Sequence, residues 1–201
     1  MTVTEAMQGQ DNLFIIGCDP GPESSALVGI VTHPSGAVSL HWAYYTDNAI
    51  LAASPSWFAC VGHSKDRTFL CYETCGAQGA FVGASTFETA AMGGEIRRAF
   101  RPLVAATYAF RPSEWRYALV GKGNAKAPEI YAAICESFNP TGGGKDPYKG
   151  TTAKPGPLWA LHEAGKGGHC EHLKDAIGVA LAVLKVRFRS GEAPEKYMRS
   201  Y

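Results

Sequence analysis

The order of the apolar runs is the feature that most constrains how this chain can fold. Residues 13–18 (LFIIGC) form a short apolar run followed by Asp-Pro-Gly at residues 19–21, which is typical of a buried strand stopped by a turn. Two further runs, 24–32 and 37–45, flank a Pro-Ser-Gly turn and predict a hairpin. The first part of the chain is therefore expected to form a three-stranded meander.

After the meander the pattern predicts a strand, a helix, another strand and then only helices. In chain order these are a strand over 68–73, a helix over 85–101, a strand over 103–110, and helices that begin at Pro112, span 127–138 and span 171–188. For residues 46–66 the pattern does not decide between a loop and a short helix. The many glycines and prolines of residues 140–156 predict a loop. This order predicts an α/β fold with a mixed five-stranded sheet flanked by helices.

Length and composition favour a single folded unit. The chain has 201 residues, of which 46% are hydrophobic and only 18% are charged, so it can build a core and does not have the composition of a disordered tail. We assign residues 13–190 to one domain. Residues 1–12 are expected to be a flexible N-terminal segment and residues 191–201 a C-terminal tail.

The charges are divided unevenly along the chain, although the net charge is only +1. Residues 1–96 contain two basic and nine acidic residues, whereas residues 97–201 contain seventeen basic and nine acidic residues. Such asymmetry is expected of a protein that binds a polyanion on one face. Chance clustering on a mixed surface would give the same pattern, and this feature alone does not decide between the two.

The cysteines and the absence of long apolar runs favour a cytoplasmic protein. None of the six cysteines forms a Cys-x-x-Cys pair, so a structural zinc site is not expected and a reducing compartment fits best. The first twelve residues are polar, unlike a signal peptide, and no run reaches the roughly 20 apolar residues of a membrane span. We therefore expect no membrane partner.

Three carboxylates occupy positions where burial is costly. Asp19 ends the first predicted strand, Glu73 ends the fourth, and Asp175 lies beside the apolar face of the last helix. Three such groups brought together repel one another unless a cation neutralises them, and Mg²⁺ and Mn²⁺ prefer oxygen ligands. A pair of these ions can catalyse phosphodiester hydrolysis. Taken singly, Asp19 is explained by a turn, Glu73 by a helix cap or a lysine partner, and Asp175 by solvent exposure.

Four sequence motifs occur in the order found in one known family. They are IGCDPG (residues 16–21), FLCYE (69–73), PSEWR followed by GKGNAK (112–126) and HLKDAIGVA (172–180). Together they resemble the RuvC-type Holliday-junction resolvases of the ribonuclease H-like superfamily, over about residues 13–188. The proline-tryptophan-basic step in PSEWR is most similar to phage-encoded members, which would act in the host cytoplasm.

The resemblance implies a ribonuclease H-like fold, a homodimer, and paired cuts in four-way DNA junctions. It implies two Mg²⁺ ions, for which Mn²⁺ substitutes, held by Asp19, Glu73 and Asp175. The family's fourth ligand position falls on His172, which shares a helix face with Asp175 because the two are three residues apart. Glu171, four residues before Asp175, lies on the same side and competes for this role.

A basic cluster follows the second carboxylate in sequence. The residues expected to contact DNA phosphates are Arg97, Arg98, Arg101, Arg116, Lys122 and Lys126. A solvated surface is the plainer explanation of such a run. A lysine typical of the family falls on Ala127 here, so either Lys126 or Lys122 replaces it or the contact is absent. Phe81, in a glycine-rich loop after Glu73, is either a wedge at a junction or, more simply, a core anchor.

Three other functions remain open from the sequence. One is a ribonuclease H-like nuclease that acts on other branched or single-stranded nucleic acid. Another is an ATP-binding phosphotransferase of the actin and hexokinase type, which also opens with strand–Asp–x–Gly but normally needs a duplicated domain that 201 residues do not accommodate. The third is a catalytically inactive DNA-binding scaffold, against which the three retained acids argue.

Overall fold

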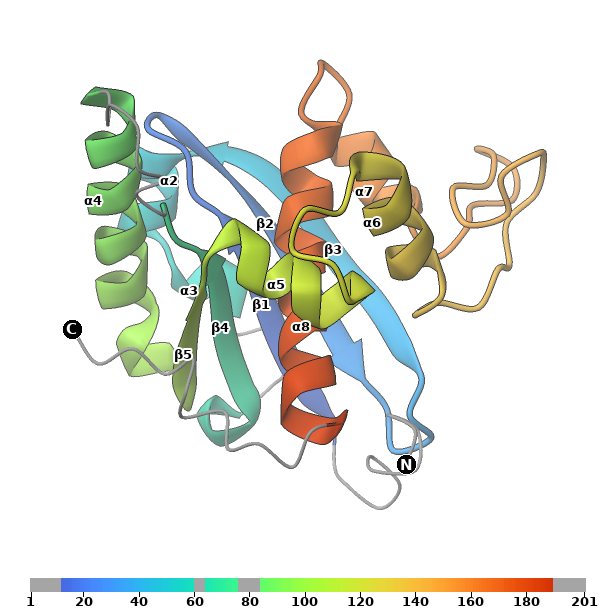
Figure 1. Ribbon diagram of the computed structural model, residues 1–201, viewed down its shortest axis with the longest axis horizontal. Coiled ribbons are helices and arrows are strands. Elements are labelled where there is room, and N and C mark those ends of the chain that lie inside the picture. The colour runs from blue at the N-terminus through green and yellow to red at the C-terminus, as the bar shows by residue number, and fades with distance from the viewer. Residues whose placement is uncertain (1–11, 60–63, 76–83, 190–201) are drawn as a thin grey trace.

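A mixed five-stranded sheet forms the centre of the computed structural model, which describes residues 12–59, 64–75 and 84–189 (Figure 1). The strand order is β3-β2-β1-β4-β5. The strands are β1 (Leu13–Asp19), β2 (Ser24–Thr32), β3 (Val38–Asp47), β4 (Thr68–Glu73) and β5 (Ala106–Phe110). Strands β1, β2 and β3 are antiparallel neighbours, whereas β4 runs parallel to both β1 and β5. The predicted meander and the mixed five-stranded sheet are confirmed.

Helices fill most of the remaining chain. They are α2 (Asn48–Ala53), α3 (Ser56–Ala59), the 3₁₀ turns η1 (Lys65–Arg67) and η2 (Arg101–Leu103), α4 (Ala84–Phe100), α5 (Pro112–Val120), α6 (Ala127–Cys135), α7 (Trp159–Ala164) and α8 (Cys170–Arg189). Within the described part of the chain, none of the helices combines the length and the apolar composition needed to cross a bilayer. The segments expected to be a flexible start and a tail, 1–12 and 191–201, lie almost wholly outside the described residues.

Some predicted boundaries are wrong by a few residues. The strand expected over 103–110 begins only at Ala106, because Arg101–Leu103 continue the end of α4 as a 3₁₀ turn that contains a proline. The helix expected over 127–138 ends at Cys135. The open region 46–66 contains two short helices, and α7 was not predicted at all.

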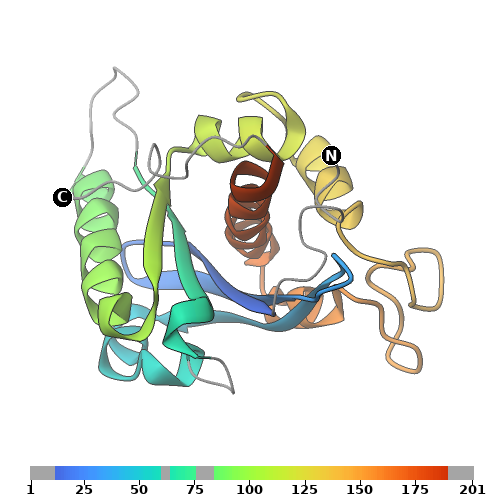
Figure 2. The same ribbon diagram turned by 90° about the horizontal axis from the view of Figure 1, so that it is seen from below.

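The sheet is covered on both faces. Helices α5, α6 and α8 lie on one side, and α2 and α4 lie on the other (Figure 2). On the first side Ile15 of β1 packs in the same buried cluster as Ile177 of α8. On the other side Phe14 shares a cluster with Ile96 and Phe100 of α4. The central strand β1 is therefore buried on both faces, as its uninterrupted apolar run predicted.

Helix α8 approaches β1 unusually closely at Gly17. A Cβ atom at Gly17 would overlap the carbonyl oxygen of Ala176 and stand 2.9 Å from Cβ of Ala180. Only small residues on both elements permit this contact. It brings the second turn of α8, which carries Asp175, beside the end of β1.

Gly17→Ala should therefore destabilise the protein by about 1–3 kcal/mol, because the added methyl group must push α8 away from β1. The free energy of unfolding in urea measures this cost. Gly94→Ala is the matched control, since a Cβ there has no neighbour within 4 Å and alanine improves the interior of α4 by up to about 1 kcal/mol. Equal stabilities of the two variants would contradict the close packing.

Candidate active site

Three carboxylates gather at one edge of the sheet. Asp19 is the last residue of β1 and Glu73 is the last residue of β4, and these strands are parallel neighbours, so their carboxyl ends lie side by side. Asp175 joins them from the second turn of α8. All three side chains are partly buried, and each lies within electrostatic reach of at least one other. The structure thus brings together the three acids that the sequence singled out.

Buried polar contacts fix the chain just after each strand. The Asn48 amide donates to the carbonyl oxygens of Gly21 (3.0 Å) and Pro22 (3.2 Å), and accepts a hydrogen bond from Ser25 Oγ (2.6 Å). These bonds hold the turn that follows Asp19. After Glu73, the backbone N–H of Thr74 donates to the carbonyl oxygen of Phe110 at 2.7 Å, which extends the pairing of β4 with β5. Both strand-end acids therefore sit on a fixed backbone.

Asp19 and Asp175 each contact a basic side chain. His172 Nδ1 lies 2.8 Å from Asp19 Oδ2, and the imidazole is 57% exposed, so it faces both the carboxylate and solvent. Arg116 Nη2 lies 3.8 Å from Asp175 Oδ2. Glu171, the competing candidate for the fourth position, instead pairs with Lys174 at 2.7 Å. The structure thus places His172 in contact with Asp19, and the choice of His172 as the fourth ligand stays a prediction.

Glu73 has a different kind of partner. The indole N–H of Trp115 donates to Glu73 Oε2 at 2.6 Å, and Trp115 is completely buried. The PSEWR motif contains Trp115, but the sequence predicted no role for this side chain. The only signal available was a tryptophan beside a basic residue at the start of a helix, which does not reveal a partner on another element.

Burial and mutual repulsion raise the pKa of the carboxylates. Burial raises the pKa of Asp19, against the opposing effect of the hydrogen bond to His172. The pKa of Glu73 rises to about 8, first because the group is buried and then because Asp19 is negative. The pKa of Asp175 rises to about 6 for the same two reasons, with Arg116 opposing. The neighbouring donors and positive charges therefore do not fully offset the cost of burying these carboxylates in their charged form.

This donor set suits a divalent cation. A cation such as Mg²⁺ would remove the repulsion, and carboxylate oxygens are its preferred protein ligands. Among the described residues, no three His, Cys, Asp or Glu side chains lie close enough together to hold a metal ion without some rearrangement. The chemistry of the donors fits such an ion, and its binding stays a prediction.

The predicted basic cluster is divided in the structure. Arg97, Arg98 and Arg101 lie at the end of α4 and in η2, on the face of the sheet opposite α8. Just after η2, the backbone N–H of Ala105 donates a hydrogen bond to the carbonyl oxygen of Thr68, the first residue of β4. Glu73 is at the other end of β4, five residues or roughly 16 Å away. These arginines therefore lie away from the acids.

The other members of the basic cluster are on the side of α8. Arg116 contacts Asp175, as described. Lys122 and Lys126 follow α5 and are exposed, and Lys122 Nζ lies 2.7 Å from Glu129 Oε1. Ala127, where the family's lysine would fall, begins α6 just beyond Lys126. Phe81 and the glycine-rich loop around it lie outside the described residues.

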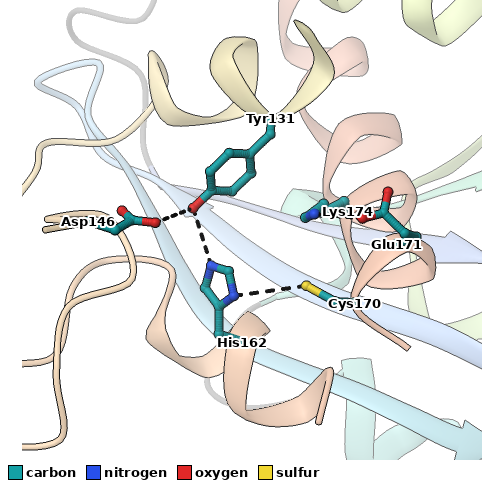
Figure 3. A network of polar contacts seen from close by, with 6 residues as sticks. All are labelled: Tyr131, Asp146, His162, Cys170, Glu171 and Lys174. Carbon is teal, nitrogen blue, oxygen red and sulfur yellow. Dashed lines mark hydrogen bonds and ion pairs between the residues drawn. The ribbon is translucent and has the colours of Figure 1, made fainter. Parts of the chain in front are cut away.

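A second polar cluster anchors the start of α8 (Figure 3). The hydroxyl group of Tyr131 lies 3.2 Å from Asp146 Oδ2 and 3.2 Å from His162 Nε2, and His162 Nδ1 lies 3.9 Å from Cys170 Sγ. These residues come from α6, the loop over 140–156, α7 and the first position of α8. The cluster ties that loop to the helix on which Asp175 is carried. This cluster was not predicted from the sequence.

Two aromatic rings stand beside the exposed imidazole of His172. Tyr45 of β3 stacks on His169 with centroids 3.8 Å apart and an interplanar angle of 10°, and the Tyr45 centroid is 5.9 Å from that of His172. His169 directly precedes α8. This stacking contributes to fixing the first turn of the helix against the sheet, and neither Tyr45 nor His169 was identified from the sequence.

Comparison with known proteins shows the fold. No family model and no curated protein matches this chain. Thermus thermophilus RuvC aligns with a TM-score of 0.57 and 17% identity, over 87% of this chain and 96% of that one. T. thermophilus RuvC in complex with Holliday junction substrate aligns with a TM-score of 0.54 and 16% identity, over 88% and 93%. The chain therefore has the ribonuclease H-like fold of RuvC-type resolvases, as its motifs predicted. The predicted closeness to phage-encoded members has no support in these matches.

The raised pKa values predict how the stability of the metal-free protein depends on pH. A raised pKa means that the folded state holds its protons more tightly than the unfolded chain does. The stabilisation from Asp175 is complete below its ordinary pKa of 3.8 and is lost as pH rises through about 6. The stabilisation from Glu73 is complete below its ordinary pKa of 4.5 and is lost as pH rises through about 8. Urea unfolding in a chelator should show falling stability from about pH 4 to about pH 8.

Glu73→Gln removes the site carboxyl whose pKa is raised to about 8, so this variant should lose less stability over that range and be more stable than the wild type at about pH 8. Glu129→Gln is the control, because Glu129 is exposed and the hydrogen bond from Lys122 lowers its pKa. The assignment is wrong if Glu73→Gln and the wild type show the same pH profile.

Proposed function

We propose that this protein is a metal-dependent endonuclease that cuts four-way DNA junctions, with Asp19, Glu73 and Asp175 as the metal-binding carboxylates. The observation that supports this most is the meeting of these acids at the carboxyl ends of β1 and β4. The fold supports it further, because T. thermophilus RuvC, a solved structure with the same fold, is described in complex with Holliday junction substrate. Other branched or single-stranded nucleic acids are the alternative substrates.

Two Mg²⁺ ions are proposed, or Mn²⁺ in their place, and when bound they would supply the Lewis acidity needed for phosphodiester hydrolysis. The protein's part is to hold the ions with Asp19, Glu73 and Asp175. His172 is proposed as the fourth ligand. Its Nδ1 is 2.8 Å from Asp19 Oδ2, so the imidazole could reach an ion that Asp19 holds.

DNA contact is proposed for both basic regions. Arg116, Lys122 and Lys126 lie on the side of α8 and are proposed to bind phosphates near the cut. The arginines at the end of α4, namely Arg97, Arg98 and Arg101, would contact a more distant part of a branched substrate. Because a junction has two equivalent cutting positions, we propose a two-fold homodimer that presents two sites.

Cleavage of labelled DNA in Mg²⁺ tests the proposal. The wild type should cut a four-way junction into products with two symmetric nicks and should leave a duplex of equal length intact. Asp19→Asn should reduce cleavage at least about 100-fold, because it removes a ligand charge, while junction binding by gel shift is retained. Asp66→Asn, which neutralises an exposed acid in η1, is the control.

Two results would contradict the proposed function. One is cleavage by Asp19→Asn at close to the wild-type rate, which would remove the carboxylates from the reaction. The other is equal competition by duplex and junction together with no preference in cutting, which would remove the junction as substrate but leave a metal-dependent nuclease.

The fourth ligand has its own test. His172→Ala should lower cleavage about 10–100-fold, since His172 contacts Asp19. Glu171→Ala should lower it by less than about threefold, because Glu171 is exposed and pairs only with Lys174 in the described structure. Single-turnover rates for the two variants give the comparison. A larger loss from Glu171→Ala would show that the ligand assignment on α8 is wrong.

A further inference from the structure

Trp115 is completely buried, yet its one polar atom is directed at a site carboxylate. The indole N–H donates to Glu73 Oε2 at 2.6 Å. The two residues are 42 positions apart, on α5 and β4. An indole N–H is a donor only and carries no charge. It can therefore orient a carboxylate without acting as a metal ligand and without neutralising the group.

The same indole rests on the helix that carries another site carboxylate. A Cβ atom at Gly178 would stand 2.7 Å from Cζ3 of Trp115, so the ring lies directly on the α8 backbone. Gly178 is three residues, about one turn, after Asp175. The indole thus contacts α8 with its ring and Glu73 with its N–H. Its position fixes the distance between the two elements that present Glu73 and Asp175.

The start of α5 is itself held in place. The backbone N–H of Arg111 donates to Glu114 Oε2 at 2.8 Å, which caps the first turn of α5 and fixes the backbone from which Trp115 projects. The following residue, Arg116, lies 3.8 Å from Asp175. Two consecutive residues of one short helix therefore contact two different site carboxylates.

We propose that Trp115 is a positioning residue of the metal site, which holds Oε2 of Glu73 through its indole N–H and leaves Oε1 to bind the metal. This inference rests on the proposed metal-dependent function. Groups that hydrogen-bond to metal ligands orient those ligands, and their loss typically weakens metal binding about 10–100-fold. Filling the space between α5 and α8 does not require the indole nitrogen, so the N–H itself is what distinguishes positioning from packing.

The chain offers a matched control in Trp42. Trp42 is also buried, packs closely over Gly29, and its indole nitrogen has no hydrogen-bond partner among the described residues. Trp42→Phe therefore removes the same atoms from a buried ring and breaks no carboxylate contact. Trp115→Phe removes the same atoms and also the hydrogen bond to Glu73.

Metal affinity measured by calorimetry with Mn²⁺ alone tests the proposal. Trp115→Phe should weaken Mn²⁺ binding about 10–100-fold, and Trp42→Phe should change it by less than about twofold. If the wild type binds Mn²⁺ and Trp115→Phe binds it equally well, the positioning role is wrong and the proposed function stands. If the wild type and Glu73→Gln bind no Mn²⁺, the proposed function is wrong and the positioning role falls with it.

A second measurement avoids dependence on the folding of Trp115→Phe. The chain has four tryptophans, so a ¹⁵N-labelled sample should give four indole N–H signals, assigned by single substitutions of Trp42, Trp57 and Trp159. Glu73→Ala should shift the Trp115 signal upfield, because the hydrogen-bond acceptor is lost, and should leave the Trp42 signal in place. An unmoved Trp115 signal would overturn the proposal.

Discussion

The mutual repulsion of three partly buried carboxylates is the constraint on which the rest of this structure depends. Burial and the neighbouring negative charge raise the pKa of Glu73 to about 8 and that of Asp175 to about 6. A protein keeps such groups together at a cost in stability, which is typical of functional sites. The contacts around the acids offset part of that cost: an imidazole at Asp19, an indole N–H at Glu73 and a guanidinium group at Asp175.

Close packing makes these contacts possible. Helix α8 can lie on β1 because Gly17 has no side chain, and the ring of Trp115 can lie on α8 because Gly178 has none. Larger residues at either glycine would move the helix away from the strand ends, and the donors would no longer reach the carboxylates. The geometry of the site therefore depends directly on how tightly the core is packed.

The sequence predicted the elements that have a clear period and failed where the signal is local or absent. The buried run before Asp19 and the helical rhythm around Asp175 are long and regular, so the strand and the helix were correctly placed. Helix α7 is only six residues long and β5 is shortened by a 3₁₀ turn, and neither feature leaves a periodic pattern. The basic cluster seemed continuous because spacing along a chain does not reveal which face of a sheet each residue occupies.

The sequence by itself determined that acids end two buried strands, that a third lies on the last helix, and that the order of elements suits a ribonuclease H-like fold. Only the tertiary structure decided their partners. The contact between His172 and Asp19 joins residues 153 positions apart, and that between Trp115 and Glu73 joins residues 42 apart. Pairings of this kind follow from how closely helices pack on the sheet, and this depends on side-chain volumes at several distant positions at once, which no local pattern records.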